Sequence, residues 1–450
     1  MAFAYSWIGP AILTVFCAAY ALVFAEERLE LRKSKPVMVA AGLIWILVAL
    51  AFDGQGRTQE LRAELQYVLV QYAELLLFLL SAMSFVNTLV ERNVFEYLRA
   101  RLTGGQLSAR AIFWIVGAAA FFLSPIADNL TTALVMGTVV VAALGHDRKA
   151  TAGALVSVVV AANAGGAFSP FGDITTLMIW QAHLIQFTQF FDLFLPALLS
   201  WLVTAAIISF TIPPKMTRVA AHSVEVRKGG YVVAILFLAT IAATVVLDHT
   251  LHLPPFLGMM MGLGALNLYS YFLHRAEIRI FAREQNGSTL SLQTGEEQKE
   301  RKPFSIFSIL EKVEWDTLLF FYGIMLCVGG LGAIGYLDIL SKFLYGGFGP
   351  TAANVFIGLL SGIIDNIPLT FAVITMNPAM DLGQWLLLTF TAGIGGSLLA
   401  IGSAAGVALM GVGRGAYTFT SHLKWTWAVL VGFVAGVAVH LFLFQELFAN

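Results

Sequence analysis

The chain carries the stretch SPIADNLTTALVM at residues 124–136 and a related stretch, SGIIDNIPLTFAVITM, at residues 361–376. Both place a Ser, an Asp and an Asn in the same order inside a longer apolar segment. The matched residues are Ser124, Asp128 and Asn129 in the first stretch and Ser361, Asp365 and Asn366 in the second. Because polar residues and Pro interrupt each segment halfway, we predict two helix, tip, helix hairpins, at 110–145 and 351–380.

A second pair of related stretches, rich in Gly, follows the two tips. NAGGAFSPFGDITTLMIW occupies residues 163–180, and GIGGSLLAIGSAAGVALMGVG occupies residues 393–413. Gly and Pro interrupt a helix and free backbone carbonyls, so the first stretch predicts a broken helix that resumes at Asp173. The helix-breaking residues are Gly165, Gly166, Pro170 and Gly172 in the first stretch and Gly395, Gly396 and Gly402 in the second.

The composition is that of a membrane protein. Hydrophobic residues make up 58% of the chain and charged residues only 12%, which is more apolar than a soluble domain. About 20 apolar residues span a bilayer as a helix, and helices satisfy their own backbone at that depth. We therefore predict an all-α polytopic membrane protein with about ten crossings. The net charge of -1, with scattered basic residues, argues against a nucleic-acid partner.

The distribution of basic residues predicts the topology. Cytoplasmic loops carry an excess of Lys and Arg. One arrangement of the crossings places all 26 Lys and Arg residues on the cytoplasmic side except Arg57, Arg62 and Lys342. Its inside segments are 26–36, 91–110, 145–149, 213–229, 274–312 and 413–424. It puts both termini in the periplasm and makes 110–145 an inner hairpin. The polar stretch 274–312 then becomes a flexible cytoplasmic linker.

The two halves of the chain are predicted to be inverted repeats. After a first transmembrane helix within 1–30, the first repeat covers 31–229, and the second covers 230–450 with the outer hairpin at 351–380. Each half contains an odd number of crossings, so the second half lies upside down relative to the first. Secondary transporters use this architecture and bind their substrates near the midplane, where broken helices of the two repeats meet.

The polar residues of the tips and breaks suit a hard cation such as sodium, which prefers carboxylate, amide, hydroxyl and carbonyl oxygens. The candidate ion-binding and proton-coupling residues are Asp128, Asn129, Thr132, Asn163, Ser169, Asp173, Thr176, Asp365, Asn366, Thr370, Ser397 and Ser403. Glu74, on a separate apolar segment, is a possible proton site.

The carboxylates favour exchange of a cation for a proton. The predicted topology leaves no Lys or Arg at the depth of Asp128 and Asp365, and an unpaired carboxylate there is costly. It must be protonated, hydrogen-bonded or bound to a cation, so a proton and a sodium ion compete for it. Competition at one alternately exposed site is antiport.

Simpler interpretations remain for these residues. Asp128, Asp173 and Asp365 could cap helices, the threonines could bond to their own helix backbone, and Glu74 could form an interhelical contact. Each of these roles is structural, and each requires no ion.

At these stretches, together with VEWDTLLFFYGIMLCVGGL at 313–331, the chain resembles the NhaD-type sodium/proton antiporters of the ion-transporter superfamily. The resemblance covers most of the chain from residue 110 onward. It implies exchange of sodium or lithium for protons across a bacterial inner membrane, with no cofactor. It also implies a homodimer in which the hairpin-bearing domain moves like an elevator against a scaffold.

Two other kinds of transporter in the same superfamily compete with this interpretation. One is a sodium-coupled symporter of an anionic substrate, and the other is an oxyanion extruder. Asp128 and Asp365 would repel an anion unless they were protonated or bound to a cation. An enzyme is not expected, because the sequence contains no GxSxG, HExxH or clustered His motif.

Overall fold

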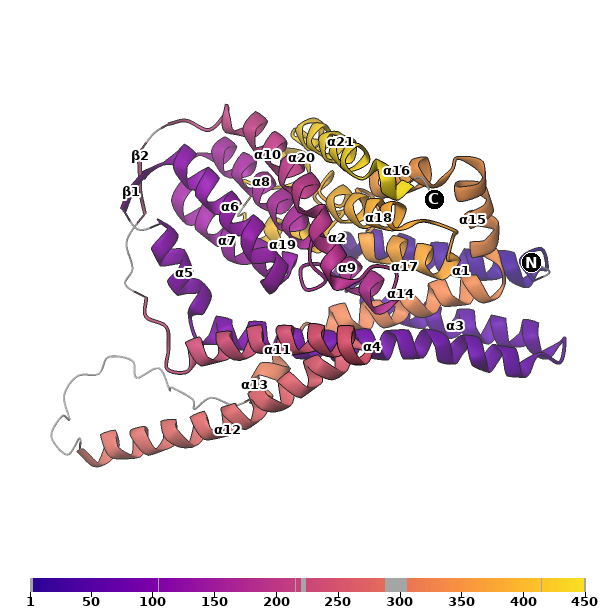
Figure 1. The fold of residues 1–450 in the computed structure, drawn as a ribbon, viewed down its shortest axis with the longest axis horizontal. Coiled ribbons are helices and arrows are strands. Elements are labelled where there is room, and N and C mark those ends of the chain that lie inside the picture. Colours follow the sequence, from indigo (N-terminus) through magenta and orange to yellow (C-terminus); the bar gives the residue numbers. More distant parts are fainter. Residues whose placement is uncertain are drawn as a thin grey trace. The chain divides into compact units, whose positions relative to one another are not determined.

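The structure, a computed structural model, describes residues 3–103, 105–214, 216–219, 224–287, 306–413 and 415–448. Almost all of its secondary structure is helical (Figure 1). The first half contains α1 (Ile8–Phe24), α2 (Glu26–Leu29), α3 (Ser34–Asp53), α4 (Thr58–Glu91), α5 (Val94–Thr103), β1 (Gly105–Ser108), α6 (Ala109–Ala127), α7 (Asn129–Leu144), α8 (Arg148–Ala167), α9 (Ile174–Gln181), η1 (Phe187–Leu193), α10 (Phe194–Ser209) and β2 (Met216–Val219). The second half contains α11 (Gly230–Leu251), α12 (Pro255–Gly287), α13 (Ile306–Glu311), α14 (Trp315–Ala333), α15 (Tyr336–Gly347), α16 (Pro350–Ser361), α17 (Asn366–Met376), α18 (Leu382–Gly395), α19 (Ala404–Val412), α20 (Phe419–Leu423), α21 (Thr426–Leu443) and η2 (Gln445–Phe448).

The predicted all-α membrane class is confirmed, with one short addition. β1 and β2 form an antiparallel ribbon in which Gly105 pairs with Val219 and Ser108 with Met216. Ser108 also caps α6, because its side chain accepts a hydrogen bond from the amide of Ala111. The ribbon therefore leads directly into the first arm of the first hairpin.

The number of candidate membrane-crossing helices agrees with the predicted ten, but their identity differs. Among the described residues, nine helices are long and apolar enough to cross, or ten if the bent pair α15 and α16 counts as one span. These nine include α6, which we assigned to a hairpin, whereas α1 and α18 are shorter. Whether 110–145 returns to the inner side of the membrane as a hairpin consequently stays a prediction.

One expectation about the polar stretch 274–312 is wrong. α12 continues to Gly287, so residues 274–287 extend a helix rather than begin a flexible linker. The end of the stretch contains the short helix α13. Residues 288–305, the middle part of the predicted linker, lie outside the described residues.

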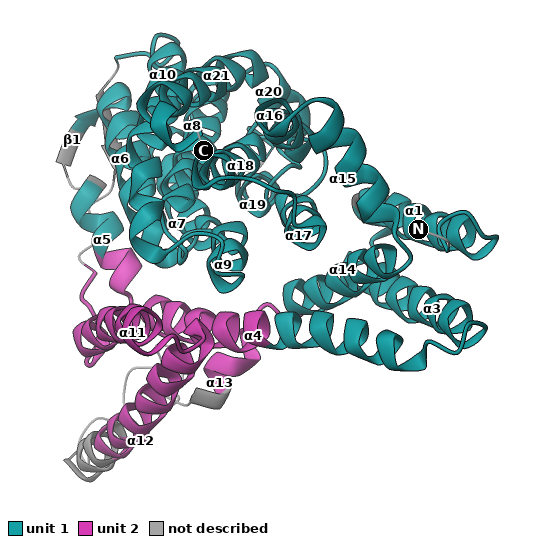
Figure 2. Cartoon of the chain, turned by 45° about the vertical axis from the view of Figure 1, so that its right-hand side comes forward, with its two compact units in different colours: residues 1–73, 98–223, 316–450 teal, residues 74–97, 224–315 magenta. Residues whose placement is uncertain are grey.

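The chain divides into two compact units, shown in different colours in Figure 2. The smaller unit comprises residues 74–97 and 224–315. Within it α11 packs against α12, Ser81 Oγ donates to the carbonyl oxygen of Met259 at 2.6 Å, and the Phe85 and Phe237 rings stack. This division does not test the predicted repeat boundaries at residues 30 and 229, which stay a prediction.

The larger unit comprises residues 1–73, 98–223 and 316–450, and it contains both tips and both broken helices. In the first repeat, α6, α7 and α8 pack against one another, and in the second α16 packs against α18. α19 of the second repeat packs against α7 of the first. The two repeats therefore meet through their tips and breaks.

Matching serines hold each hairpin against its own broken helix. Ser124 Oγ donates to the carbonyl oxygen of Ala162 at 2.6 Å, and Ser361 Oγ donates to that of Ala392 at 2.8 Å. Both bonds are buried, so each satisfies polar groups that would otherwise be costly at this depth. The repeated sequence thus produces a repeated contact.

Candidate functional site

The two tip aspartates act as helix caps. Asp128, at φ 57°, accepts hydrogen bonds from the amide and hydroxyl of Thr131 at 2.7 and 2.9 Å, and it precedes α7. Asp365 precedes α17 and accepts from the amide of Ile367 at 3.4 Å. The capping interpretation of both residues is therefore confirmed.

Asp365 is also paired, which corrects our expectation that no basic residue reaches the tips. Lys33, at the start of α3, places its Nζ 3.7 Å from Asp365 Oδ2, and both side chains are about one-fifth exposed (23% and 21%). The same Nζ lies 4.4 Å from the centre of the Phe320 ring. The error arose because Lys33 was assigned to a cytoplasmic loop by its sequence position, although a Lys side chain is long enough to reach inward.

The broken helices form as predicted. α8 ends at Ala167 and α9 begins after Asp173, whose Oδ1 accepts from the amide and hydroxyl of Thr175 at 3.0 and 3.1 Å. In the second repeat Ser403 caps α19 by accepting from the amide of Gly406. The two breaks therefore differ in charge, because Asp173 is an acid and its counterpart Ser403 is neutral.

Asp173 is the carboxylate on which both tips converge. Its Oδ2 accepts from Asn129 Nδ2 at 2.9 Å and from Asn366 Nδ2 at 3.2 Å. Asp173 is only 5% exposed, and four donated hydrogen bonds use the acceptor positions that an ionised carboxylate offers. Sequence reasoning gave most weight to Asp128 and Asp365, whereas the structure brings the two asparagines, not the two aspartates, to one point.

The hydrogen bonds continue from Asp173 into the second break. Asn129 Nδ2 lies 3.1 Å from Asn163 Oδ1, and Asn163 Nδ2 donates to Ser397 Oγ at 2.8 Å. Asn163 and Ser397 are fully buried. Five of the predicted site residues therefore form one connected network: Asn366, Asp173, Asn129, Asn163 and Ser397.

Two further predicted residues contribute buried oxygens that make no hydrogen bond. Thr132 and Thr370 are 0% exposed, and within the described part of the chain neither hydroxyl has a hydrogen-bond partner. The side-chain oxygens of Asn129 and Asn366 likewise accept no hydrogen bond from any residue that the structure describes, because both amides turn their nitrogen to Asp173. Hydroxyl and amide oxygens are ligands that a hard monovalent cation prefers.

Ser169, Pro170 and Thr176 hold the first break together. Ser169 Oγ donates to the carbonyl oxygen of Pro125 at 2.8 Å, and Thr176 Oγ1 lies 2.8 Å from the carbonyl oxygen of Ser169 and 2.6 Å from that of Asp173. Pro170 lies in the turn between α8 and α9. These contacts give Ser169 and Thr176 a structural role, and their place as ion ligands stays a prediction.

Glu74 lies half-buried on α4, at the start of the smaller unit. Its role as a proton site stays a prediction. Among the described residues, no group of three or more His, Cys, Asp or Glu is placed to hold a metal ion. The candidate site is therefore one acid surrounded by neutral amides and hydroxyls.

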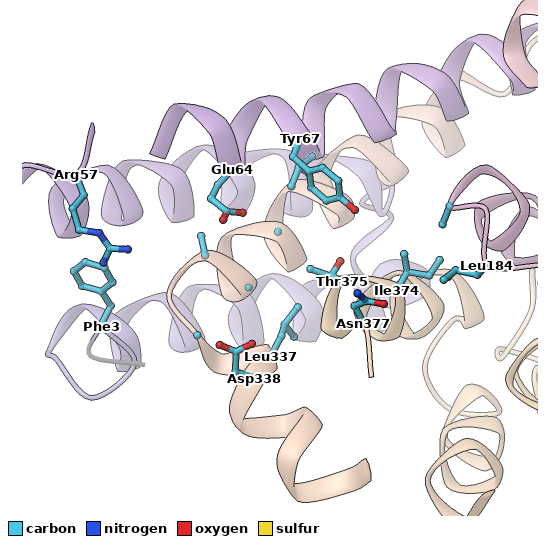
Figure 3. A pocket seen from close by; sticks show the side chains of 16 residues that line it. Phe3, Arg57, Glu64, Tyr67, Leu184, Leu337, Asp338, Ile374, Thr375 and Asn377 are labelled. Atoms are coloured by element: carbon cyan, nitrogen blue, oxygen red, sulfur yellow. The ribbon is translucent and has the colours of Figure 1, made fainter. Parts of the chain in front are cut away.

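A cavity of about 630 Å³ lies in the larger unit, near the far end of α17 (Figure 3). Glu64 and Tyr67 of α4, Asp338 of α15, and Thr375 and Asn377 at the end of α17 line it. α17 contains 11 residues, so it is about 16 Å long. One end of this helix holds Asn366 against Asp173. The other end borders an acidic cavity, since the basic residue of its lining, Arg57, is paired with Glu60.

Sequence reasoning missed two residues next to the site. His422 and Tyr417 are both 0% exposed, and His422 Nε2 lies 2.8 Å from the carbonyl oxygen of Ser397. We had assigned residues 413–424 to an inner loop. The signal that could have revealed them is a His and a Tyr in a short connection between two strongly apolar segments.

Comparison with known proteins identifies the family of the chain. The CitMHS family model, described as a citrate transporter, matches residues 4–393. A Na(+)/H(+) antiporter NhaD from Alkalimonas amylolytica is 49% identical over 98% of this chain and 92% of its own length. The chain belongs to the NhaD antiporter family.

The NhaD resemblance inferred from the motifs is thereby confirmed. A second NhaD antiporter, from Vibrio cholerae serotype O1, is 48% identical over 99% of this chain and 94% of its own length. Sodium/proton antiporter 1 of Arabidopsis thaliana is 30% identical over 97% of this chain and 73% of its own. The NhaD likeness therefore includes residues 1–109, where the motifs alone indicated little.

Proposed function

We propose that this protein exchanges sodium or lithium for protons, and that Asp173 is the carboxylate for which the two ions compete. One observation carries the proposal: asparagines from the tips of both repeats donate to the same oxygen of Asp173. A transporter that alternates its access needs a site shared by the two inverted repeats. The names of the NhaD relatives support the same activity.

The chemistry of the amides explains how binding can move the tips. Protonation of Asp173 Oδ2 replaces an acceptor by an O–H donor, which then faces the N–H groups of Asn129 and Asn366. A cation at the same oxygen also opposes these N–H groups, unless each amide turns its oxygen inward. Either ion therefore breaks the contacts that join the tips in this structure, which links binding to rearrangement of the hairpins.

The buried hydroxyls of Thr132 and Thr370 complete the proposed cation site. Each is on the helix that begins at a tip asparagine, and neither hydroxyl is used by the protein within the described residues. An unpaired buried hydroxyl costs about 1–3 kcal/mol, so a bound cation offsets that cost. Asp128 adds negative charge at the first cap, whereas Asp365 at the second cap is paired with Lys33.

The cavity beside Glu64 and Asp338 is the proposed entry from the outer side. In the predicted topology both residues belong to outer segments. Two exposed acids raise the local concentration of cations, an effect that falls as ionic strength rises. α17 then connects this entry to Asp173.

The remaining parts of the proposal concern the assembly. We propose a bacterial inner-membrane location with both termini in the periplasm, supported by the distribution of Lys and Arg and by the bacterial NhaD relatives. We further propose a homodimer that works by an elevator movement, which follows from the family resemblance. The lipid bilayer and the transported monovalent cations are the partners that these relatives imply, and an enzymatic activity is not part of the proposal.

An anionic substrate, suggested by the citrate-transporter description of the family model, is the competing function. Asp173 with its four donors already holds the negative charge at the centre of the site. A citrate carboxylate placed there would meet that charge, and the basic side chain at the tips, Lys33, is already paired with Asp365. We therefore do not adopt symport of an anion or extrusion of an oxyanion.

The test uses purified protein in proteoliposomes carrying a pH-sensitive dye. Wild type should release protons from an acid interior when external sodium or lithium is added, and citrate should have no effect. Asp173→Asn should abolish this response, while Ser403→Asn, at the matching cap of the other repeat, should retain part of it. Wild-type exchange in Asp173→Asn would refute the assignment of the site, and citrate-dependent sodium uptake by wild type would refute antiport.

A further inference from the structure

Two buried side chains outside the predicted site hold the second helix break. Tyr417 Oη lies 2.7 Å from His422 Nδ1, and His422 Nε2 lies 2.8 Å from the carbonyl oxygen of Ser397. Both residues are fully buried, and both lie outside the helices that are long enough to cross a membrane. Neither contact is needed for a helix cap or a turn.

The partners fix the tautomer of His422. A backbone carbonyl oxygen only accepts hydrogen bonds, so Nε2 carries the proton and donates it to Ser397. Nδ1 is then the acceptor, and the Tyr417 hydroxyl donates to it. Burial lowers the pKa of His422 to about 4 and raises the pKa of Tyr417, so both are neutral at physiological pH and the chain of donors has one direction.

Ser397 transmits this constraint to the ion site. Its backbone carbonyl receives the His422 hydrogen bond, and its side-chain oxygen receives the hydrogen bond from Asn163 Nδ2 at 2.8 Å. Because the amide nitrogen of Asn163 is held by Ser397, its oxygen faces Asn129 Nδ2 at 3.1 Å. Asp173 sets the direction of these bonds because its carboxylate only accepts, and Ser397 holds the Asn163 amide at the place where Asn129 can reach it.

We propose that Tyr417 and His422 are positioning residues for the cation site, acting through Ser397 and Asn163 to hold Asn129 in place beside Asp173. The proposal rests on the proposed function, because it assigns them to that same site. Neither residue contacts the cation or carries the proton. Residues of this kind, which orient the direct ligands of an ion, alter affinity by about tenfold or more when removed.

A second buried histidine provides a matched control. His440 on α21 is also 0% exposed, and its Nε2 lies 3.0 Å from the carbonyl oxygen of Gly383. Gly383 is at the start of α18, whereas Ser397 follows its end. The two histidines thus form the same bond to opposite ends of one helix, and only His422 reaches the network.

The experiment measures the sodium dependence of exchange in proteoliposomes, together with the sodium-induced shift in melting temperature of the detergent-purified protein. Tyr417→Phe and His422→Leu should raise the KM for sodium about tenfold, with less than a twofold change in maximal rate. His422→Gln retains an N–H group that can reach the Ser397 carbonyl and should restore most of the affinity. His440→Leu should leave the KM unchanged.

The outcomes separate this inference from the proposed function. If Asp173→Asn loses the sodium-induced shift but Tyr417→Phe and His422→Leu keep a wild-type KM, the positioning role is wrong and the site stands. If Asp173→Asn keeps the shift, the site itself is misassigned. An equal rise in KM in His440→Leu would also overturn the inference, because the effect would then be a general response to core damage. Should His422→Leu fail to fold, Tyr417→Phe, which removes a single oxygen, still decides the question.

Discussion

At the scale of single residues, Asp173 combines a structural and a chemical role. One of its oxygens caps α9 through Thr175, and the other receives the two tip asparagines. The sequence could not separate these roles, because an Asp after a Gly-rich break is typical of a helix cap whether or not anything else contacts it. What distinguishes Asp173 is the second oxygen, and its partners come from segments far apart in the chain.

The unpartnered hydroxyls of Thr132 and Thr370 give a prediction at this scale. Thr132→Val and Thr370→Val remove only a hydroxyl that the described protein does not use, so the melting temperature without sodium should stay the same or rise. The KM for sodium should rise, because each change removes a candidate ligand. Thermal unfolding with and without sodium, and sodium titration of exchange, provide the measurements.

Thr176→Val is the contrasting control for the threonine variants. The Thr176 hydroxyl contacts two backbone carbonyls across the first break. Its removal should therefore lower the free energy of unfolding by about 1 kcal/mol, and the melting temperature should fall accordingly. If Thr132→Val and Thr370→Val lose as much stability without sodium as Thr176→Val does, the hydroxyls of Thr132 and Thr370 bond to the protein and the prediction is wrong.

At the scale of elements, two glycines let each hairpin approach its broken helix. A Cβ on Gly165 would overlap the carbonyl oxygen of Phe121, and a Cβ on Gly395 would overlap that of Gly358. Phe121 and Gly358 lie three residues before Ser124 and Ser361, whose hydroxyls bond to the same broken helices. Each glycine and its serine therefore form one contact, present in both repeats.

This contact predicts that Gly165→Ala destabilises the protein. The obstacle is a backbone oxygen that no side-chain rotation can move, so we expect a loss of about 1–3 kcal/mol from overpacking and reduced exchange. Gly42→Ala on α3, where an added Cβ meets nothing within 4 Å, should be neutral or stabilising because Ala favours a helix. Melting temperatures of the two variants in one detergent make the comparison, and equal values would contradict the close approach.

At the scale of the whole molecule, the ion site and Glu74 belong to different compact units. The tips, breaks and acidic cavity belong to the larger unit, whereas Glu74 belongs to the unit formed by 74–97 and 224–315. α4 contributes to both units, because it runs from Thr58 to Glu91. The role of Glu74 as a proton site therefore stays a prediction separate from the network around Asp173.

The orientation in the membrane is the prediction that belongs to this scale. Gln55 and Arg148 are both exposed, and the predicted topology puts them on opposite sides. In a background with Cys17 and Cys327 replaced by Ala, a membrane-impermeant maleimide added to intact cells should label Gln55→Cys and spare Arg148→Cys. Everted vesicles should give the reverse pattern, and labelling of Arg148→Cys from outside would invert the topology.

Most of the helical elements and most of the candidate site residues could be predicted from the amino-acid sequence. Apolar segments of spanning length indicated a helical membrane protein, and Gly, Pro and Asp placed the breaks at α8 to α9 and α18 to α19 where they occur. These features are local, because helix propensity and capping depend on residues a few positions apart. The repeated Ser, Asp and Asn also identified both tips, and the NhaD family followed from the same stretches.

Which of those residues contact one another depends on the tertiary fold. It brought Asn129 and Asn366 to Asp173, paired Lys33 with Asp365, and added Tyr417 and His422 behind Ser397. Each of these except the Tyr417 bond to His422 joins residues more than 20 positions apart. Long side chains and close helix packing determine such contacts, and neither leaves a periodic signal in the sequence.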